Sequence, residues 1–141
     1  MQENLLKIVA ESKTLEEKLK QISNLIQGKI VFSTSFGIED QVISHAIFSQ
    51  NIKNIEVFTL DTGRLFPETY SVWDKTQLQY NTKIKAYYPN SESIEKYINE
   101  NGINAFYNSV ELRKDCCIIR KVEPLNRALV GATIWITGLR A

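Results

Sequence analysis

Two adjacent cysteines, Cys116 and Cys117, are the only cysteines in the chain and its clearest candidates for chemistry. Neighbouring residues on a regular backbone do not offer the separation and orientation that a disulfide needs, so we do not expect them to bond to each other. Two thiols followed closely by Arg120 and Lys121 indicate half of a metal site, with buried structural cysteines as the alternative. An iron–sulfur cluster usually takes four thiolates, of which this chain can supply two.

A second candidate site lies at residues 33–37 (STSFG), between an expected strand and an expected helix. Small hydroxyl residues and a glycine let backbone N–H groups approach an anion, and the helix N-terminus adds a favourable dipole. The dipole contributes about 0.3–1 kcal/mol, whereas micromolar binding needs roughly 8 kcal/mol. An anion would therefore need cations as well, and an ordinary serine-rich turn is the alternative. The candidate cations are Arg64, Arg113, Lys114, Arg120, Lys121 and Arg140.

Acidic residues accompany both turns that we expect at strand ends. Glu39 and Asp40 fall in the first turn of the expected helix, where acids are favoured, but they would repel a bare triphosphate. Residues 61–64 (DTGR) follow a second expected strand, and Asp and Gly are common turn formers. If this turn is functional, Asp61 or the backbone contacts a ribose or base, with Arg64 nearby as a cation.

The elements that position these residues follow from hydrophobic spacing. Thr14 and Glu17 form a predicted capping box. Residues 103–115 give no clear prediction, and Pro124 is expected to interrupt the last helix. Expected strands are 30–32, 55–60, 84–88 and 133–137; expected helices are 2–27 in two parts, 42–47, 67–80, one from Ser91 or Ser93 to about 102, and 116–130.

Four remaining ring side chains receive no catalytic role from their positions. His45, the only histidine, falls inside the helix after the first loop, where we expect a structural or surface role. Tyr70 and Trp73 lie on the helix after Pro67, and Trp135 lies in a strand. We expect all three to be core residues.

Strands that alternate with helices predict an α/β fold, a three-layer α/β/α arrangement with a mainly parallel sheet. Such sheets bind ligands at the carboxyl ends of their strands, where the strand order reverses. Three polar segments follow expected strands and should converge at that edge: residues 33–40, 61–64 and 137–140.

Composition is that of one soluble globular domain: 141 residues, 43% hydrophobic and 23% charged. The net charge of +1 disfavours nucleic acid, and we expect neither a membrane span nor a secretory signal. Available thiols favour a cytoplasmic location. We expect residues 1–28 to form an N-terminal helical segment and residues 29–141 an α/β nucleotide-binding domain that is incomplete at its C-terminus. A homo-oligomer is possible, because a truncated sheet can expose an edge.

Together these motifs resemble the adenylyl-sulfate and phosphoadenylyl-sulfate reductase family of sulfate assimilation. Four segments carry the resemblance in the family's order and cover the chain from about Lys29 to its end. They are residues 33–40 (STSFGIED), 61–70 (DTGRLFPETY), 116–125 (CCIIRKVEPL) and 137–140 (TGLR).

The resemblance implies an adenine-nucleotide α-hydrolase-like fold with a modified pyrophosphatase loop that cradles the phosphosulfate. The second turn would lie at the nucleotide, and Arg140 near the sulfate. The substrate-binding residues so implied are Ser33, Thr34, Ser35, Phe36, Gly37, Glu39, Asp40, Asp61, Thr62, Gly63, Arg64, Leu65, Arg120, Thr137, Gly138 and Arg140.

The resemblance also implies that Cys116 and Cys117 are two of the four ligands of a [4Fe–4S] cluster, in the subgroup that uses adenylyl sulfate. Lys121 would lie between cluster and substrate. In the family reaction a C-terminal cysteine attacks the sulfur, AMP leaves, and thioredoxin or a related thiol such as glutaredoxin releases sulfite. This chain has no such cysteine, so we expect the nucleophile beyond Ala141 and activity only in a longer parent protein.

Three other functions remain open. A phosphoadenylyl-sulfate reductase would use the 3′-phosphorylated nucleotide. An ATP-pyrophosphatase or sulfurylase would show Ser-Gly-Gly-x-Asp-Ser, whereas Thr34 and Ser35 occupy the glycine positions here. A catalytically incomplete nucleotide-binding module would bind a nucleotide without catalysing either reaction.

Overall fold

The computed structural model describes residues 14–138, an alternation of helices and parallel strands. The strands are β1 (Lys29–Ser33), β2 (Ile55–Leu60), β3 (Lys85–Tyr87) and β4 (Ala132–Ile136). The α-helices are α2 (Leu15–Leu25), α3 (Ile38–Ser49), α4 (Pro67–Tyr80), α5 (Ser91–Asn101), α6 (Val110–Cys117) and α7 (Glu123–Leu129). Two shorter helical turns complete the order, the 3₁₀ turn η1 (Ala105–Tyr107) and the π-helical turn η2 (Ile118–Val122).

The four described strands form one parallel sheet in the order β3-β2-β1-β4, which confirms the predicted fold class. The chain runs outward from β1 to β2 and β3, then returns through α5, α6 and α7 to place β4 on the other side of β1. The strand order therefore reverses between β1 and β4. The carboxyl ends of these two strands are where such a sheet binds ligands.

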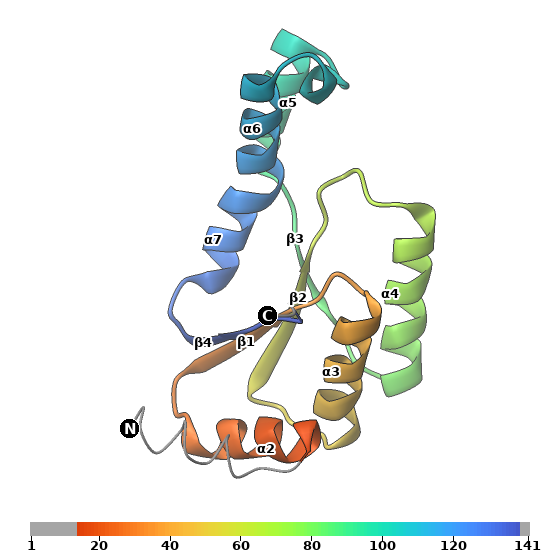
Figure 1. The fold of residues 1–141 in the computed structure, drawn as a ribbon, viewed down its shortest axis with the longest axis vertical. Helices are drawn as coiled ribbons and strands as arrows, with labels where there is room; N and C mark the ends of the chain where they lie inside the picture. Colours follow the sequence, from red (N-terminus) through yellow and green to blue (C-terminus); the bar gives the residue numbers. More distant parts are fainter. Residues whose placement is uncertain (1–13, 139–141) are drawn as a thin grey trace.

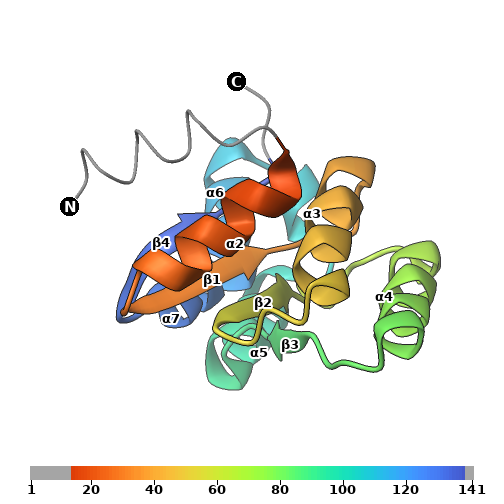
Figure 2. The same ribbon diagram turned by 90° about the horizontal axis from the view of Figure 1, so that it is seen from below.

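Helices cover both faces of the sheet (Figures 1 and 2). On one face Phe32 of β1 belongs to a buried cluster with residues of α2, α3 and β2. On the other face Val31 and Phe58 pack against Ala128 of α7. Consecutive residues of β1 thus point to opposite layers, as the period of a strand requires. This produces the three-layer arrangement that the sequence predicts.

Local signals set the helix starts. Thr14 caps α2 and accepts from the Glu17 N–H at 3.1 Å, as predicted. The prediction that Ser91 or Ser93 caps α5 is wrong, because Asn90 is the N-cap and its Oδ1 accepts from the Ser93 N–H. The second part of the predicted 2–27 helix is α2; the first part lies outside the described residues.

The predicted interruption at Pro124 is also wrong. Helical backbone continues from α6 through η2 into α7, with no break at the proline. A proline inside a helix removes one hydrogen bond and crowds the preceding turn. The π-helical turn η2 ends two residues before Pro124 and widens the turn that the proline would crowd, so the chain passes the proline without leaving helical conformation.

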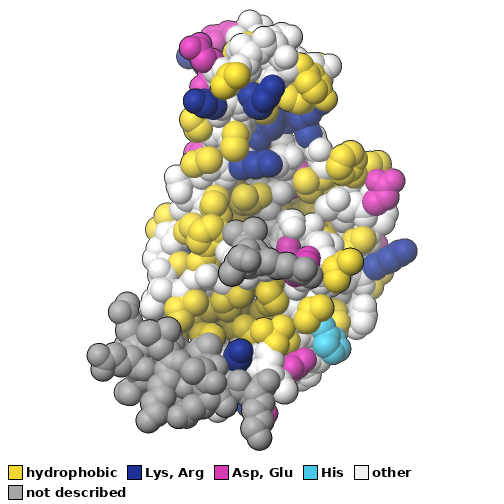
Figure 3. Space-filling model, viewed as in Figure 1, with side chains coloured by type: hydrophobic (Ala, Val, Ile, Leu, Met, Phe, Trp, Pro, Cys, Tyr) yellow, Lys and Arg dark blue, Asp and Glu magenta, His cyan; other side chains and the backbone are white. Residues whose placement is uncertain are grey.

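The segment α5–η1–α6, residues 91–117, projects from the carboxyl end of the sheet at the top of Figure 1. We call this segment the cysteine lobe, because Cys116 and Cys117 close its last helix. None of its residues belongs to the two buried clusters described above. On the face in Figure 3, Lys and Arg side chains gather on this upper part of the molecule and at its junction with the sheet.

Within residues 14–138, no helix combines the length and apolar character that crossing a membrane requires.

Candidate functional site

A cavity of about 550 Å³ opens at the carboxyl ends of β1, β2 and β4. This volume is in the range of small-molecule sites. Because its walls include the loops after β1 and β4, the cavity spans the point where the strand order reverses. Its lining residues are Ser33, Thr34, Ser35, Gly37, Glu39, Asp40, Thr59, Leu60, Thr62, Leu65, Thr69, Lys121, Trp135, Thr137 and Gly138.

The loop after β1 is organised around the buried carboxylate of Asp40. Asp40 Oδ2 accepts from both the N–H and the Oγ–H of Ser35, each at 2.7 Å. The Phe36 N–H donates to Thr34 Oγ1 at 3.1 Å. Asp40 therefore holds the loop in its turn from the first turn of α3, and the Ser35 N–H is already engaged by a protein acceptor.

Phe36 completes the turn by adopting a left-handed backbone, with φ of 65°. This conformation is uncommon for a large side chain and persists only where surrounding contacts stabilise it. The Phe36 ring is buried and stacks on Trp73 of α4, with ring centroids 5.8 Å apart. Phe36 thus anchors the loop in the core and does not line the cavity.

Gly138, after β4, lies directly against the same carboxylate. A Cβ atom at this position would overlap Asp40 Oδ1. The absence of a side chain at 138 lets the segment after β4 approach the first loop. The predicted convergence of residues 33–40 with 137 and 138 is therefore present, and it depends on this glycine.

The turn after β2 is fixed by its own side chains. Asp61 Oδ1 accepts from the Gly63 N–H at 2.9 Å and from the Tyr70 hydroxyl at 2.8 Å. Thr62 Oγ1 accepts from the Arg64 N–H at 3.1 Å, and Gly63 has φ of 80°, a conformation that favours glycine. Asp61 is thus committed to holding the turn, while Thr62 lines the cavity.

The hydrogen bond to Asp61 raises the pKa of Tyr70 above its ordinary value of 10.0, and burial adds to the rise. A raised pKa in the folded state means that the contribution to stability is fully present below pH 10 and is lost as pH rises through the raised pKa. In Tyr70→Phe, we expect the stability that the wild type loses through ionisation of Tyr70 at high pH no longer to be lost. Thermal unfolding of both proteins from about pH 9 to about pH 11 checks this, and identical pH profiles would contradict the role of the bond.

Arg64 does not line the cavity. Its guanidinium donates to the Ile103 carbonyl and to Asn104 Oδ1, both at 3.1 Å, and its Cζ lies 4.7 Å from the centre of the Phe106 ring. The cation predicted for the nucleotide therefore contacts the connection between α5 and α6.

Trp135 is not the core residue that the sequence suggested. Its side chain is 45% exposed, lines the cavity, and donates from Nε1 to Ser33 Oγ at 2.9 Å. Because β4 has a neighbour only on its β1 side within the described sheet, an alternating strand pattern there does not bury every apolar residue. Trp73, in contrast, packs against the core as predicted. The prediction that Tyr70 is a core residue is wrong, because Tyr70 is 37% exposed and its hydroxyl bonds to Asp61.

His45 has the surface position that we predicted. It is exposed on α3, and its Nδ1 lies 2.7 Å from the Tyr80 hydroxyl.

Two cations on η2 lie close to the cavity. Lys121 is one of its lining residues. Arg120 is buried, and its guanidinium donates to the Thr62 carbonyl at 2.5 Å, behind the wall that Thr62 forms. Among residues 14–138, the buried Arg120 Nε has no hydrogen-bond partner. A π-helical turn thus places one cation at the cavity and the next against the turn after β2.

Cys116 and Cys117 are free thiols, half-buried and exposed respectively. Burial raises the pKa of the Tyr97 phenol, and the neighbouring Cys116 and Asp115 raise it further. No group of three or more His, Cys, Asp or Glu within residues 14–138 could hold a metal ion. Two soft thiol donors next to Arg120 and Lys121 fit an iron–sulfur group as half of its ligand set.

The structure brings most of the predicted site residues together around the cavity. Phe36, Asp61, Gly63, Arg64 and Arg120 lie behind its wall or away from it, and Arg140 lies outside the described residues. Four lining residues were not predicted from the sequence. Two of them, Thr59 and Leu60, could have been, because they lie at the carboxyl end of β2, where ligands bind such a sheet. The missed residues are Thr59, Leu60, Thr69 and Trp135.

Comparison with known proteins agrees with this geometry. A family model described as the phosphoadenosine phosphosulfate reductase domain matches residues 29–141. The adenosine 5′-phosphosulfate reductase of Sinorhizobium fredii is 50% identical over an alignment of 139 positions, and the match covers 93% of this chain and 55% of the relative. That of Rhizobium meliloti is 52% identical over 130 residues, 92% of this chain and 48% of the relative. The chain spans about half the length of the curated relatives it matches.

A solved structure shares the fold. The phosphoadenylyl-sulfate reductase of Candida auris, crystallised as a phosphate complex, superposes with a TM-score of 0.79 at 26% sequence identity. The match covers 99% of this chain and 66% of the other.

Proposed function

Because the chain belongs to the phosphoadenosine phosphosulfate reductase domain family, we propose that it is the nucleotide-binding part of an adenylyl-sulfate reductase. The complete protein would reduce adenylyl sulfate to sulfite and AMP with electrons from thioredoxin or glutaredoxin, in the cytoplasmic assimilation of sulfate. The observation that carries this proposal is the cavity at the carboxyl ends of β1 and β4, where the strand order reverses. Each of the four segments that carry the resemblance contributes lining residues, although Cys116 and Cys117 are not among them. Relatives named for this activity are 50% and 52% identical.

In this proposal the loop after β1 receives the phosphosulfate. The hydroxyls of Ser33 and Thr34 line the cavity and can donate to anionic oxygens, and the N-terminus of α3 adds a favourable dipole. Asp40 holds the loop in this shape before substrate binds, since it already accepts both Ser35 donors. Such preorganisation reduces the cost of ordering the loop on binding.

Lys121 is the cation that we assign to the sulfonyl end of the substrate. It lines the cavity from η2, four residues after Cys117. A lysine there lowers the electrostatic cost of bringing an anionic sulfonyl group towards a thiolate-rich site. We assign Thr62 and Leu65 to the nucleoside, because both lie on the β2 side of the same cavity.

Cys116 and Cys117 would hold one half of a [4Fe–4S] cluster, whose other two ligands this chain does not contain. When bound, the cluster would supply a compact centre of thiolate and sulfide charge close to the substrate. The two cysteines are thereby assigned as ligands and not as nucleophiles. The nucleophilic thiolate that attacks sulfur and displaces AMP would come from a part of the complete protein outside these 141 residues.

Calorimetric titration of the chain with AMP and with adenylyl sulfate tests the proposal. We expect both to bind and adenylyl sulfate to lose more affinity than AMP in Lys121→Ala. Lys75→Ala, on the exposed surface of α4, is the matched control and should bind both ligands as the wild type does. Absence of binding by either nucleotide would contradict the assignment of the cavity.

The substrate of the second candidate function, phosphoadenylyl sulfate, carries a 3′-phosphate. The structural similarity to the Candida auris enzyme, which is named for that substrate, supports this alternative. Titration with adenosine 3′,5′-bisphosphate separates the two. Tighter binding of the bisphosphate than of AMP would favour the alternative, and weaker binding would favour adenylyl sulfate.

The metal assignment has its own measurement, which does not depend on activity. In the complete protein purified anaerobically, iron and sulfide content and visible absorbance should fall in Cys116→Ser, because one of the four thiolate ligands is lost. Unchanged iron content in that variant would contradict the role of the pair.

A further inference from the structure

We infer that Arg64 is a positioning residue that couples the nucleotide cavity to the cysteine lobe, and not a ligand for the nucleotide. This inference rests on the proposed function for the identity of the ligand, but its mechanical part stands on contacts alone. It assigns to one side chain the task of tying the connection between α5 and α6 to the turn after β2, while the continuous helix α6–η2–α7 carries Cys116 and Cys117.

Within residues 14–138, the side-chain contacts of Arg64 are with the connection between α5 and α6. The guanidinium donates to the Ile103 carbonyl and to Asn104 Oδ1, each at 3.1 Å, and stacks over the Phe106 ring at 4.7 Å. These partners lie 39 to 42 positions further along the sequence. A planar guanidinium can satisfy two acceptors and an aromatic face at once, which a lysine ammonium cannot reproduce.

The turn that carries Arg64 is itself held by a second arginine. Arg120 of η2 donates to the Thr62 carbonyl, and its Nη1 would lie 3.2 Å from a Cβ at Gly63. Arg120, from the helical turn that follows the cysteines, therefore contacts this turn, and Arg64 of the turn contacts the cysteine lobe. Thr62, between these contacts, lines the cavity.

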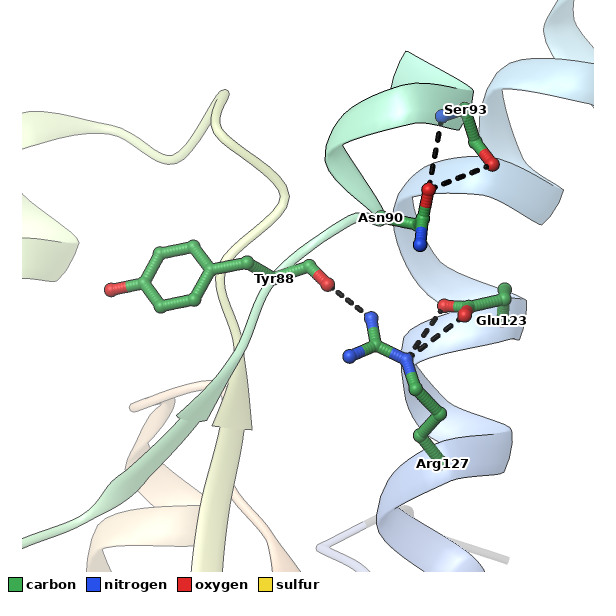
Figure 4. A network of polar contacts seen from close by, with 5 residues as sticks. All are labelled: Tyr88, Asn90, Ser93, Glu123 and Arg127. Atoms are coloured by element: carbon green, nitrogen blue, oxygen red, sulfur yellow. Dashed lines mark hydrogen bonds and ion pairs between the residues drawn. The ribbon is translucent and has the colours of Figure 1, made fainter. Parts of the chain in front are cut away.

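The cysteine lobe buries Tyr97 and Ala105 among its own residues but contributes nothing to the two clusters that join the sheet to its helices, so polar contacts contribute to its placement. Neither buried cluster described above includes a residue of α5, η1 or α6. At its base, Arg127 of α7 donates to the Tyr88 carbonyl just before the lobe and pairs with Glu123, while Asn90 and Ser93 start α5 (Figure 4). Segments with few apolar contacts have a low free energy of local opening.

A ligand that shifts the Thr62 segment would consequently act on the lobe through Arg64. A nucleotide can stabilise one arrangement of the lobe only if it binds the protein more tightly in that arrangement. The coupling is therefore reciprocal, and a change in the lobe must alter the affinity for the nucleotide. A loosened lobe should therefore weaken nucleotide binding, although no lobe residue lines the cavity.

Hydrogen exchange measured by mass spectrometry on the whole chain, with and without saturating AMP, tests the inference. In Arg64→Lys without AMP, we expect amide exchange in residues 91–117 to rise at least about fivefold, while β1 and β2 keep their wild-type protection. In the wild type AMP should slow exchange in the lobe, and in Arg64→Lys this slowing should be lost. Asn104→Ala should reproduce the effect, and combining it with Arg64→Lys should add little.

Arg113→Lys is the matched control within the lobe. Arg113 is exposed and makes one long hydrogen bond, at 3.5 Å, to the Phe106 carbonyl, so its exchange profile should stay within about twofold of the wild type. Wild-type exchange in both Arg64→Lys and Asn104→Ala would overturn the coupling, whatever AMP does. Faster lobe exchange in the variants together with no binding of AMP to the wild type would instead retain the mechanical role and reject the proposed ligand.

Discussion

Asp40→Ala is expected to lower the free energy of unfolding by about 3 kcal/mol and to weaken AMP binding at least about tenfold. The buried carboxylate accepts two short hydrogen bonds from Ser35, and hydrogen bonds to a charged acceptor contribute about 1.5–3 kcal/mol each. Removing it leaves a backbone N–H without its acceptor and frees the loop after β1 from its turn. Urea denaturation and calorimetric titration measure the two effects separately.

Asp74→Ala provides the control, because Asp74 is an exposed aspartate on α4 and its removal should change stability by less than about 0.5 kcal/mol. Gly138→Ala approaches the same carboxylate from β4 and should weaken AMP binding in the same direction, since the added methyl group displaces Asp40. Wild-type affinity in both Asp40→Ala and Gly138→Ala would show that the loop does not need this carboxylate.

Phe32→Ala is expected to cost about 3–5 kcal/mol of unfolding free energy. Phe32 is fully buried in the central strand β1, in the cluster that joins the sheet to α2 and α3. Truncating it removes apolar contacts and leaves a cavity between two layers that cannot collapse freely. Because Ser33 and the loop follow Phe32 directly, the site should loosen as the core does. Urea denaturation with a fitted slope measures the change.

Phe66→Ala makes the same chemical change at a position that is 76% exposed and should alter stability by less than about 0.5 kcal/mol. Equal losses in Phe32→Ala and Phe66→Ala would contradict the assignment of Phe32 to the core and Phe66 to the surface.

The sequence by itself determined the fold class and the edge of the sheet that carries the site. Short apolar runs such as residues 55–60 are strands because β-branched and aromatic residues suit a buried parallel sheet. Helical spacing between the strands then requires crossover connections, and these connections bring the polar strand ends to one edge. The clustering of Ser33, Thr62 and Thr137 around one cavity follows from these local rules.

Local patterns could not specify the partner of each polar side chain. Asp40 and Arg64 looked like possible nucleotide contacts, yet Asp40 holds the Ser35 donors and Arg64 contacts Asn104 in the lobe. Pairing of this kind depends on the distance between segments far apart in the sequence, which hydrophobic periodicity does not encode. The sequence shows that a charged group is present, but not which acceptor lies within reach.

The tertiary structure also decided which apolar residues are core. Trp135 has the same strand-like surroundings in sequence as a buried residue, but β4 is paired only with β1 in the described sheet, and its indole lies at the cavity. Likewise, Pro124 continues a helix because the π-helical turn before it adjusts the backbone. In both cases the sequence determined the local conformation to which a residue is suited. The exposure of Trp135 was set by which strand pairs with β4, a partner that is distant in sequence. The continuity of the helix at Pro124 was set by the backbone of the π-helical turn before it.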